Sequence, residues 1–158
     1  MSSSWLRKAR AVPTLMTTYR VGLLQAKAFR LLNARTAELL RPHGLRPLEW
    51  AMMGLLFDEA GGMRPASLAK ALGVKPPQIT TVLGRLRGAG LFSVRVDEDD
   101  RRYKCVAITD KGKELVPNVE RDLRGSMRGL VEGVSPRDMA GYADVLAAIV
   151  RNGERADR

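Results

Sequence analysis

The sequence predicts a mainly helical fold that contains one small β-hairpin. Apolar residues recur every three or four positions through most of the chain, which is the period of an amphipathic helix. Around residues 92–108 the period changes to alternation, which is typical of strands. The chain of 158 residues is long enough to bury a core, and we expect residues 1–158 to form a single domain.

Residues 13–40 form the first predicted helix, after a basic lead-in over residues 1–12 that we expect to be frayed. Its apolar positions keep returning to one face, with basic residues between them. Val21, Leu24 and Phe29 make the apolar surface wider than one stripe. Such a helix is expected to contact two neighbours, its own domain on one side and a second subunit on the other.

Prolines and glycines divide the middle of the chain. Pro47, Pro65 and Pro76 each open an apolar stretch, because the first turn of a helix tolerates a residue without an N–H group. Gly44 and Gly73 stand where helices are expected to end. The predicted helices cover residues 47–59, 65–72 and 76–89.

The next segment reads as two strands and then two helices. Phe92, Val94 and Val96 alternate with polar residues, which predicts a strand with one buried face. A second strand ends before Thr109, a natural N-cap for the helix that follows. That helix is predicted to continue its apolar pattern to Val134, and a last helix follows from residue 136 to about residue 150.

A helix-turn-helix followed by a hairpin is the winged form of this motif, which puts one helix in the DNA major groove and the hairpin tip beside the backbone or minor groove. The predicted helix over residues 76–89 has an apolar face that includes Ile79 and Leu86. Its other face carries amide, hydroxyl and guanidinium groups, which suit base edges and phosphates. An ordinary polar surface is the alternative interpretation of that face.

The charge balance indicates a polyanionic partner. The chain has 27 Lys and Arg against 17 Asp and Glu, a net charge of +10. A basic chain binds nucleic acid or a membrane surface, and charge alone does not choose between them. We see no apolar run long enough to span a bilayer and no secretory signal, so we expect a cytoplasmic protein without a membrane partner. One Cys and one His exclude an internal disulfide framework and indicate neither a metal site nor a cofactor.

The hairpin resembles a known family signature. Asp100-Arg101-Arg102, then Val106-Ala107-Ile108-Thr109 and Gly112, resemble the D-x-R…V-x-L-T-x-x-G pattern of the MarR family of transcriptional regulators. The resemblance implies a homodimer held by its N- and C-terminal helices, about residues 14–46 and 113–150. It implies a winged helix-turn-helix DNA-binding region over about residues 47–112.

The resemblance also implies a function. Each subunit would present a recognition helix and a wing to half of a palindromic operator, and the protein would act as a repressor. A small lipophilic or anionic effector would release the DNA. Two departures from the family pattern affect sequence specificity. Pro76-Pro77 replaces polar residues at the start of the recognition helix, and Thr81 stands where the family often has a larger residue.

The candidate DNA-binding residues lie on the recognition helix and the wing: Lys75, Pro77, Gln78, Thr80, Thr81, Arg85, Arg101 and Arg102. A Gln side chain can read adenine bidentately, and Arg85 can grip guanine or phosphate. Arg102 is the first candidate for the minor groove. Asp100 is expected to orient Arg85 or Arg102. The alternative for the wing arginines is pairing with the acidic residues 97–100.

Five residues are candidates for an effector pocket, with plain core as the equal alternative: Tyr19, Phe29, Trp50, Met53 and Phe57. His43 fits a pH sensor or, more simply, a helix-capping or packing residue. Cys105 fits a redox sensor or a structural thiol, and no second cysteine in the chain can resolve an oxidised form.

Two rival functions remain at the level of the sequence. An architectural or RNA-binding winged protein without a switch would share the basic charge. An enzyme would need a catalytic constellation, and we find no such arrangement of residues in the sequence. We therefore expect a DNA-binding regulator and not an enzyme.

Overall fold

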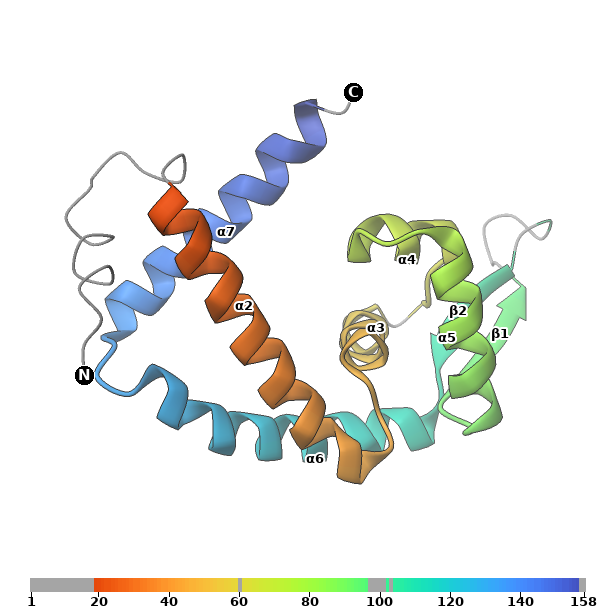
Figure 1. Cartoon of the computed structure of the whole chain (residues 1–158). Coiled ribbons are helices and arrows are strands. Elements are labelled where there is room, and N and C mark those ends of the chain that lie inside the picture. The colour runs from red at the N-terminus through yellow and green to blue at the C-terminus, as the bar shows by residue number, and fades with distance from the viewer. Residues whose placement is uncertain (1–18, 60, 97–101, 103, 157–158) are drawn as a thin grey trace. The chain divides into compact units, whose positions relative to one another are not determined.

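The computed structural model describes residues 19–59, 61–96, 102 and 104–156. Figure 1 shows these residues as helices joined by short turns, with one hairpin. The elements are α2 (Tyr19–Leu40), α3 (Pro47–Asp58), α4 (Pro65–Leu72), α5 (Pro76–Gly88), β1 (Phe92–Val96), β2 (Lys104–Ile108), α6 (Asp110–Met127) and α7 (Pro136–Ala156). Short 3-10 helices cover Arg41–His43 and Arg128–Val131. The chain divides into two compact units, one up to Leu123 and one from Arg124 onward.

The helix boundaries in the first unit follow the prolines and glycines as predicted. Pro47, Pro65 and Pro76 are the first residues of α3, α4 and α5. Gly44 and Gly73 end the preceding helices with φ angles of 69° and 63°, in the left-handed region that favours glycine. None of the helices in the described part of the chain is long and apolar enough to cross a membrane.

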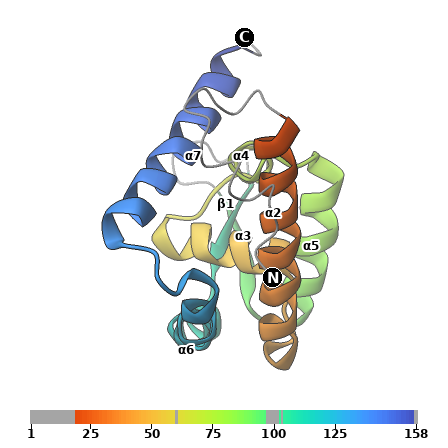
Figure 2. The same ribbon diagram turned by 60° about the vertical axis from the view of Figure 1, so that its left-hand side comes forward.

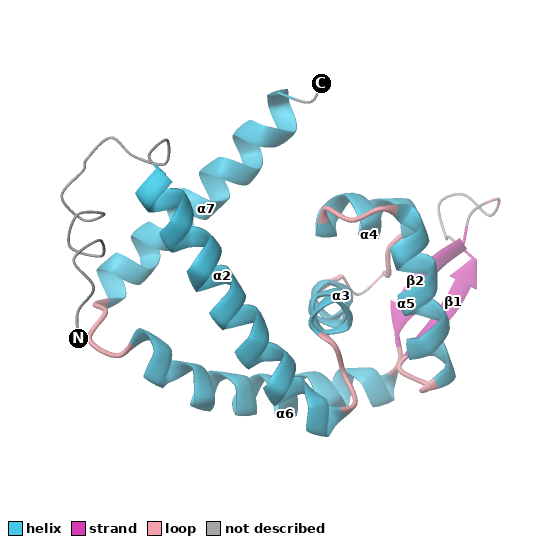
Figure 3. Cartoon of the chain, viewed as in Figure 1, coloured by secondary structure: helices cyan, strands magenta, loops and turns pink. Residues whose placement is uncertain are grey.

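The hairpin is antiparallel and pairs Phe92 with Ile108 and Val94 with Val106 (magenta in Figure 3). The backbone of Met63 joins the other edge of β2: its N–H donates to the Val106 carbonyl at 2.9 Å and its carbonyl accepts from the Val106 N–H at 2.8 Å. Gly62 makes this approach possible, because a Cβ at that position would lie 2.6 Å from the Val106 carbonyl oxygen. The predicted break at residues 61–62 is therefore also a docking point for the hairpin.

One prediction about the hairpin was wrong. Of the three apolar residues expected on the buried face of β1, only Phe92 is buried, whereas Val94 is 46% and Val96 is 55% exposed. Val94, Arg95 and Val96 are all exposed, so the residues that the structure describes leave the second half of the strand uncovered. In β2, by contrast, every residue from Cys105 to Ile108 is buried. The Cys105 thiol therefore lies inside the protein, 3.9 Å from the Gly61 carbonyl oxygen.

The core of the first unit is built from side chains of α3, α4, α5 and the hairpin, closed by the end of α2 and the first half of α6. Figure 1 views α3 nearly along its axis and Figure 2 shows it from the side, with α2 and α5 at its end. The largest fully buried apolar side chains are Leu40, Met52, Met53, Leu56, Leu68, Ile79, Leu86 and Val119. This packing holds α5 against α3 and α4, with its opposite face open.

The start of α6 is capped as predicted. The Thr109 hydroxyl oxygen accepts from the Gly112 N–H at 3.2 Å and the hydroxyl donates to the Gly90 carbonyl at 2.7 Å. The predicted extension of this helix to Val134 was wrong, because α6 ends at Met127 and Gly133, with a φ of 79°, turns the chain before α7.

Helix α7 is capped by Ser135, whose hydroxyl oxygen accepts from the Asp138 N–H at 3.1 Å. No residue of α7 is buried. Its exposed large apolar side chains are Met139, Tyr142, Val145, Leu146, Ile149 and Val150. An amphipathic helix that leaves its whole apolar face uncovered is suited to association with another surface.

Two glycines of α6 provide a test of the packing. A Cβ at Gly112 would lie 2.7 Å from the Leu91 carbonyl oxygen and 2.6 Å from Ile108, whereas a Cβ at Gly125 meets nothing within 4 Å. We predict that Gly112→Ala lowers the free energy of unfolding by about 1–3 kcal/mol. The control Gly125→Ala should leave it unchanged or raise it by up to about 1 kcal/mol. Urea denaturation measures both; equal effects of the two changes would contradict the packing described here.

Candidate nucleic-acid interface

Helix α5 exposes the face on which the candidate DNA-binding residues lie. Ile79 and Leu86 are buried on its inner side. The side chains of Lys75, Pro77, Gln78, Thr80 and Thr81 are all exposed. The two faces predicted from the sequence are therefore present, and the outer face carries no acidic residue.

The polar groups of this face are partly engaged within the helix itself. The Gln78 side-chain carbonyl accepts from the Lys75 N–H at 3.1 Å and so caps the start of α5. The Thr81 hydroxyl donates to the Pro77 carbonyl at 3.1 Å, and the Thr80 hydroxyl donates to the Pro76 carbonyl at 3.4 Å. Each hydroxyl oxygen keeps lone pairs for an amino group of a base, and each threonine methyl can contact a thymine methyl. Gln78 keeps its NH₂ group as a donor.

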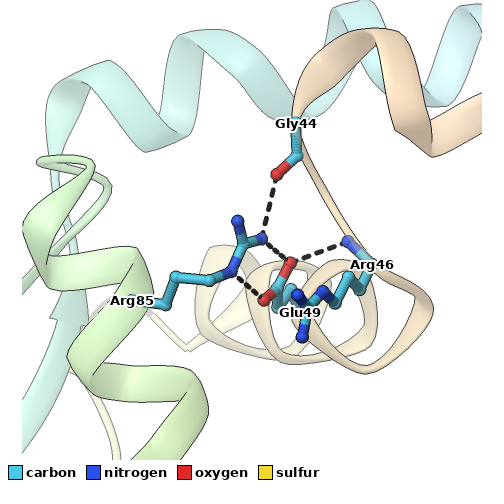
Figure 4. A network of polar contacts seen from close by, with 4 residues as sticks. All are labelled: Gly44, Arg46, Glu49 and Arg85. Carbon is cyan, nitrogen blue, oxygen red and sulfur yellow. Dashed lines mark hydrogen bonds and ion pairs between the residues drawn. The ribbon is translucent and has the colours of Figure 1, made fainter.

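Arg85 lies at the C-terminal end of the same face and is held by the body of the protein (Figure 4). Its Nε and Nη2 atoms donate to the two carboxylate oxygens of Glu49 in α3. Nη2 also donates to the Gly44 carbonyl at 2.9 Å. The backbone N–H of Arg46 donates to the same carboxylate at 2.7 Å. One guanidinium group thus joins α5 to the start of α3 and to the turn that follows α2.

Glu49 is the buried partner in this network. Its side chain is 2% exposed, whereas that of Arg85 is 44% exposed. Hydrogen bonding to Glu49 raises the pKa of Arg85 by more than desolvation lowers it. A bidentate contact between an arginine and a carboxylate restrains orientation as well as distance. The side chain of Arg85 is therefore fixed before any DNA arrives.

Glu49 was not among the candidate site residues predicted from the sequence. The residue occupies the third position of α3, where a carboxylate can cap the helix, and the Arg46 N–H contact is such a cap. That signal predicts a capping residue at the surface. It does not predict burial, and nothing local indicates a partner 36 positions later in the chain.

His43 has a partner that the sequence did not indicate either. Its Nε2 atom lies 3.0 Å from Oδ2 of Asp122 in α6, and the His43 side chain is 20% exposed. The turn formed by residues 41–46 is therefore tied to α6 on one side and to α5 on the other.

The wing is described in part. Arg102 is exposed, as a DNA-contacting residue must be. Arg101 and Asp100 lie outside the described residues. The structure therefore does not test the expected pairing of Asp100 with Arg85. Within the described part of the chain, the carboxylate that pairs with Arg85 is that of Glu49.

The five effector-pocket candidates occupy different environments. Met53 is fully buried, Trp50 is half-buried, and Phe29 and Phe57 are 67% and 44% exposed. The side chain of Tyr19, the first residue of α2, lies outside what the structure describes. None of these residues lines either of two hollows in the first unit. One hollow, of about 290 Å³, is lined by Ala37, Arg41, Gly44, Leu45, Arg46, Pro47 and Arg85. The other, of about 350 Å³, lies between α5 and β1.

The described residues contain no cluster of three or more His, Cys, Asp or Glu side chains that could hold a metal ion. What the structure presents is a helix-turn-helix, made by α4 and α5, followed by an antiparallel hairpin. This arrangement defines the winged helix-turn-helix class of proteins.

Comparison with known proteins agrees with this class and narrows it. The MarR family model matches residues 55–104. CouR from Rhodococcus jostii RHA1, solved bound to p-coumaroyl-CoA, is 25% identical over 82% of this chain and 91% of its own, with a TM-score of 0.77. The chain is thus similar to the MarR family of transcriptional regulators, through the family model over the helix-turn-helix and hairpin and through structures that share its fold along most of its length.

Two further structures share the fold at lower identity. NadR in complex with 4-hydroxyphenylacetate is 21% identical, with a TM-score of 0.73, and the match covers 88% of this chain and 98% of NadR. MepR of S. aureus, solved as a DNA complex, is 20% identical, with a TM-score of 0.71, and the match covers 85% of this chain and 98% of MepR.

The network around Glu49 predicts a stability effect. Removing the guanidinium in Arg85→Ala leaves a buried carboxylate with fewer partners, and we expect the free energy of unfolding to fall by about 1–3 kcal/mol. Arg87→Ala, an exposed change on the same helix, should alter it by no more than about 0.5 kcal/mol. Thermal or urea unfolding distinguishes the two. An effect of Arg85→Ala no larger than that of Arg87→Ala would show that the network contributes nothing to folding.

Proposed function

We propose that the protein is a sequence-specific DNA-binding regulator of transcription that acts as a homodimeric repressor. Each subunit inserts the outer face of α5 into the major groove of one half of a palindromic operator. The wing places Arg102, and Arg101 beside it, at the minor groove. Because such a regulator acts where the DNA is, the proposal also places the protein in the cytoplasm.

The observation that carries this proposal is the outer face of α5. Lys75, Gln78 and Thr81 are exposed along one side of a helix whose other side is anchored in the core. The face combines one cation with amide and hydroxyl groups and has no carboxylate to repel phosphates. In MepR, the same fold has been solved with DNA. The similarity to MarR-family regulators supports the interpretation of this face as a recognition surface.

The homodimer is supported by the uncovered apolar surfaces of the terminal helices. Leu23, Phe29 and Leu31 of α2 are exposed, as is the apolar face of α7. Burying such surfaces between two copies removes apolar area from water and supplies the usual driving force for association. The proposed dimerisation helices lie at about residues 14–46 and 113–150, and the DNA-binding region lies between them.

The effector we propose is a small lipophilic or anionic molecule. CouR and NadR were solved with p-coumaroyl-CoA and with 4-hydroxyphenylacetate, both of which carry an aromatic ring and negative charge. In this chain, Arg41 and Arg46 line one hollow, and their positive charges suit an anion. Tyr19, Phe29, Trp50, Met53 and Phe57 remain candidates for contacts to an aromatic ring once a second subunit is present.

DNA binding can be tested by a fluorescence anisotropy titration with DNA from upstream of the gene and with a scrambled duplex. We predict tight binding to the first and affinity at least roughly a thousandfold weaker for the second at physiological salt. Arg102→Ala should weaken specific binding by about 1–3 kcal/mol because it removes the cation from the minor groove.

Arg155→Ala is the control for the loss of one positive charge, since Arg155 is exposed in the last turn of α7, outside the proposed DNA-binding surface and beyond residues 113–150. Equal affinity for both duplexes would favour the architectural alternative, and single-stranded RNA in the same assay tests the RNA-binding one. Wild-type affinity of Arg102→Ala would remove Arg102 from the interface.

The dimer can be tested by light scattering. At micromolar concentration we predict twice the chain mass of 17.4 kDa. Ile149→Asp places a charge on the exposed apolar face of α7 and should shift the protein to the monomer. Arg151→Asp introduces the same side chain at an exposed polar position of α7 and should leave the mass unchanged. A monomeric wild type would exclude the dimer, and a dimeric Ile149→Asp would exclude the apolar face of α7 as its interface.

A further inference from the structure

The turn between α2 and α3 is held from two directions. On one side, the Gly44 carbonyl accepts from Arg85 of α5 at 2.9 Å. On the other side, His43 lies 3.0 Å from Asp122 of α6. Two adjacent residues, His43 and Gly44, thus connect α5 to α6.

The contact between Arg85 and Glu49 is the most constrained part of this junction. It uses two nitrogen atoms and both carboxylate oxygens, which fixes the plane of the guanidinium group relative to α3 (Figure 4). The carboxylate is additionally held by the Arg46 N–H at 2.7 Å. Because Glu49 is only 2% exposed, loss of either partner would leave a buried carboxylate without its compensating hydrogen bonds.

The position of Arg85 on α5 makes this contact relevant to DNA reading. Arg85 follows Thr81 by one helical turn and Gln78 by two, so the three side chains lie along one side of the helix. A clamp at one end of that side therefore controls how the helix is rotated about its own axis. Reading a base edge requires side chains placed to within about 0.5 Å and 10–20°.

The same contact makes Arg85 a poor ligand for phosphate. The positive charge of the guanidinium is already compensated by a buried carboxylate, so moving it to DNA would leave Glu49 uncompensated inside the protein. Arg85 thus differs from Lys75, Gln78 and Thr81, because its charged group is held by an internal partner, whereas these three exposed side chains can turn to DNA.

We propose that Glu49, acting through Arg85, is a positioning residue that sets the orientation of α5 for sequence recognition, and that Arg85 does not itself bind DNA. This inference rests on the proposed function as a DNA-binding regulator. It replaces one of the DNA contacts expected from the sequence with an internal clamp.

The test is Glu49→Gln, which keeps the size of the side chain and removes its charge. Glu59→Gln is the matched control, because Glu59 is an exposed carboxylate that directly follows α3, outside the proposed dimerisation helices. Affinities for upstream and scrambled DNA are measured over a range of salt concentrations, at a temperature where circular dichroism shows each variant to be folded. We expect Glu49→Gln to lower the ratio of specific to scrambled affinity roughly tenfold or more, the size of one lost base contact.

The affinity of Glu49→Gln for scrambled DNA and the slope of log affinity against log salt should stay at the wild-type values, because no phosphate contact is lost. Arg85→Gln should behave in the same way, and Glu59→Gln should change nothing. The opposite result is also well defined. If Arg85 binds phosphate, Arg85→Gln lowers the salt slope by about one and Glu49→Gln, which frees the guanidinium, strengthens binding to both duplexes.

Two further measurements cover the remaining outcomes. If Glu49→Gln does not fold, the double variant Glu49→Gln/Arg85→Gln, which removes both charges together, replaces it, and a wild-type specificity ratio in that variant overturns the proposal. If the wild type shows no specificity, the proposed function fails, and amide hydrogen exchange without DNA then tests the clamp. Glu49→Gln should speed exchange in α5 and in residues 43–46 but not in α7, and unchanged exchange in α5 would refute the clamp.

Discussion

The carboxylate of Glu49 is the constraint on which the arrangement of the first unit depends. It is the one charged side chain that is buried among the residues that the structure describes. A buried charge must be compensated, and the available partners are the guanidinium of Arg85 and the N–H of Arg46. Satisfying Glu49 therefore fixes the start of α3, the turn before it and the angle at which α5 crosses the core.

The exposed face of α5 and the exposed face of α7 differ in chemistry and therefore suit different partners. On α5 the exposed face carries polar side chains such as Gln78 and Thr81, whereas Ile79 and Leu86 on the inner face are buried in the core. On α7 the apolar side chains themselves are exposed. A polar face on a rigid support suits recognition of a hydrated polyanion, whereas an apolar face without cover suits contact with another apolar face. The proposed regulator uses the first for DNA and the second for its own partner subunit.

Local signals made much of the fold predictable from the sequence. Pro47, Pro65 and Pro76 open helices because proline fits the first turn, and Gly73 closes one because it adopts a positive φ. The class of the fold followed from the order of these elements and the signature near the hairpin. The burial of β1 was not predictable in this way, because alternation shows that a strand has two faces and does not show how far the neighbouring helices extend over one of them.

The candidate interface was predictable to the same degree. The exposed side of α5 follows from helical periodicity, and its polar residues could be named in advance. The contact between Glu49 and Arg85 could not, since it joins residues 36 positions apart and depends on the packing of α3 against α5. Sequence analysis therefore assigned Arg85 to DNA by its type and its place on the helix, whereas its hydrogen bonds indicate an internal role.

The central claim is that two copies of α5 read a two-fold symmetric DNA site. Hydroxyl-radical footprinting on DNA from upstream of the gene tests it most directly. The account predicts two protected half-sites whose centres lie about one helical turn, roughly 10 base pairs, apart, with protection that extends to the flanking minor grooves. Uniform protection along the duplex, or a single protected half-site at saturating protein, would contradict it.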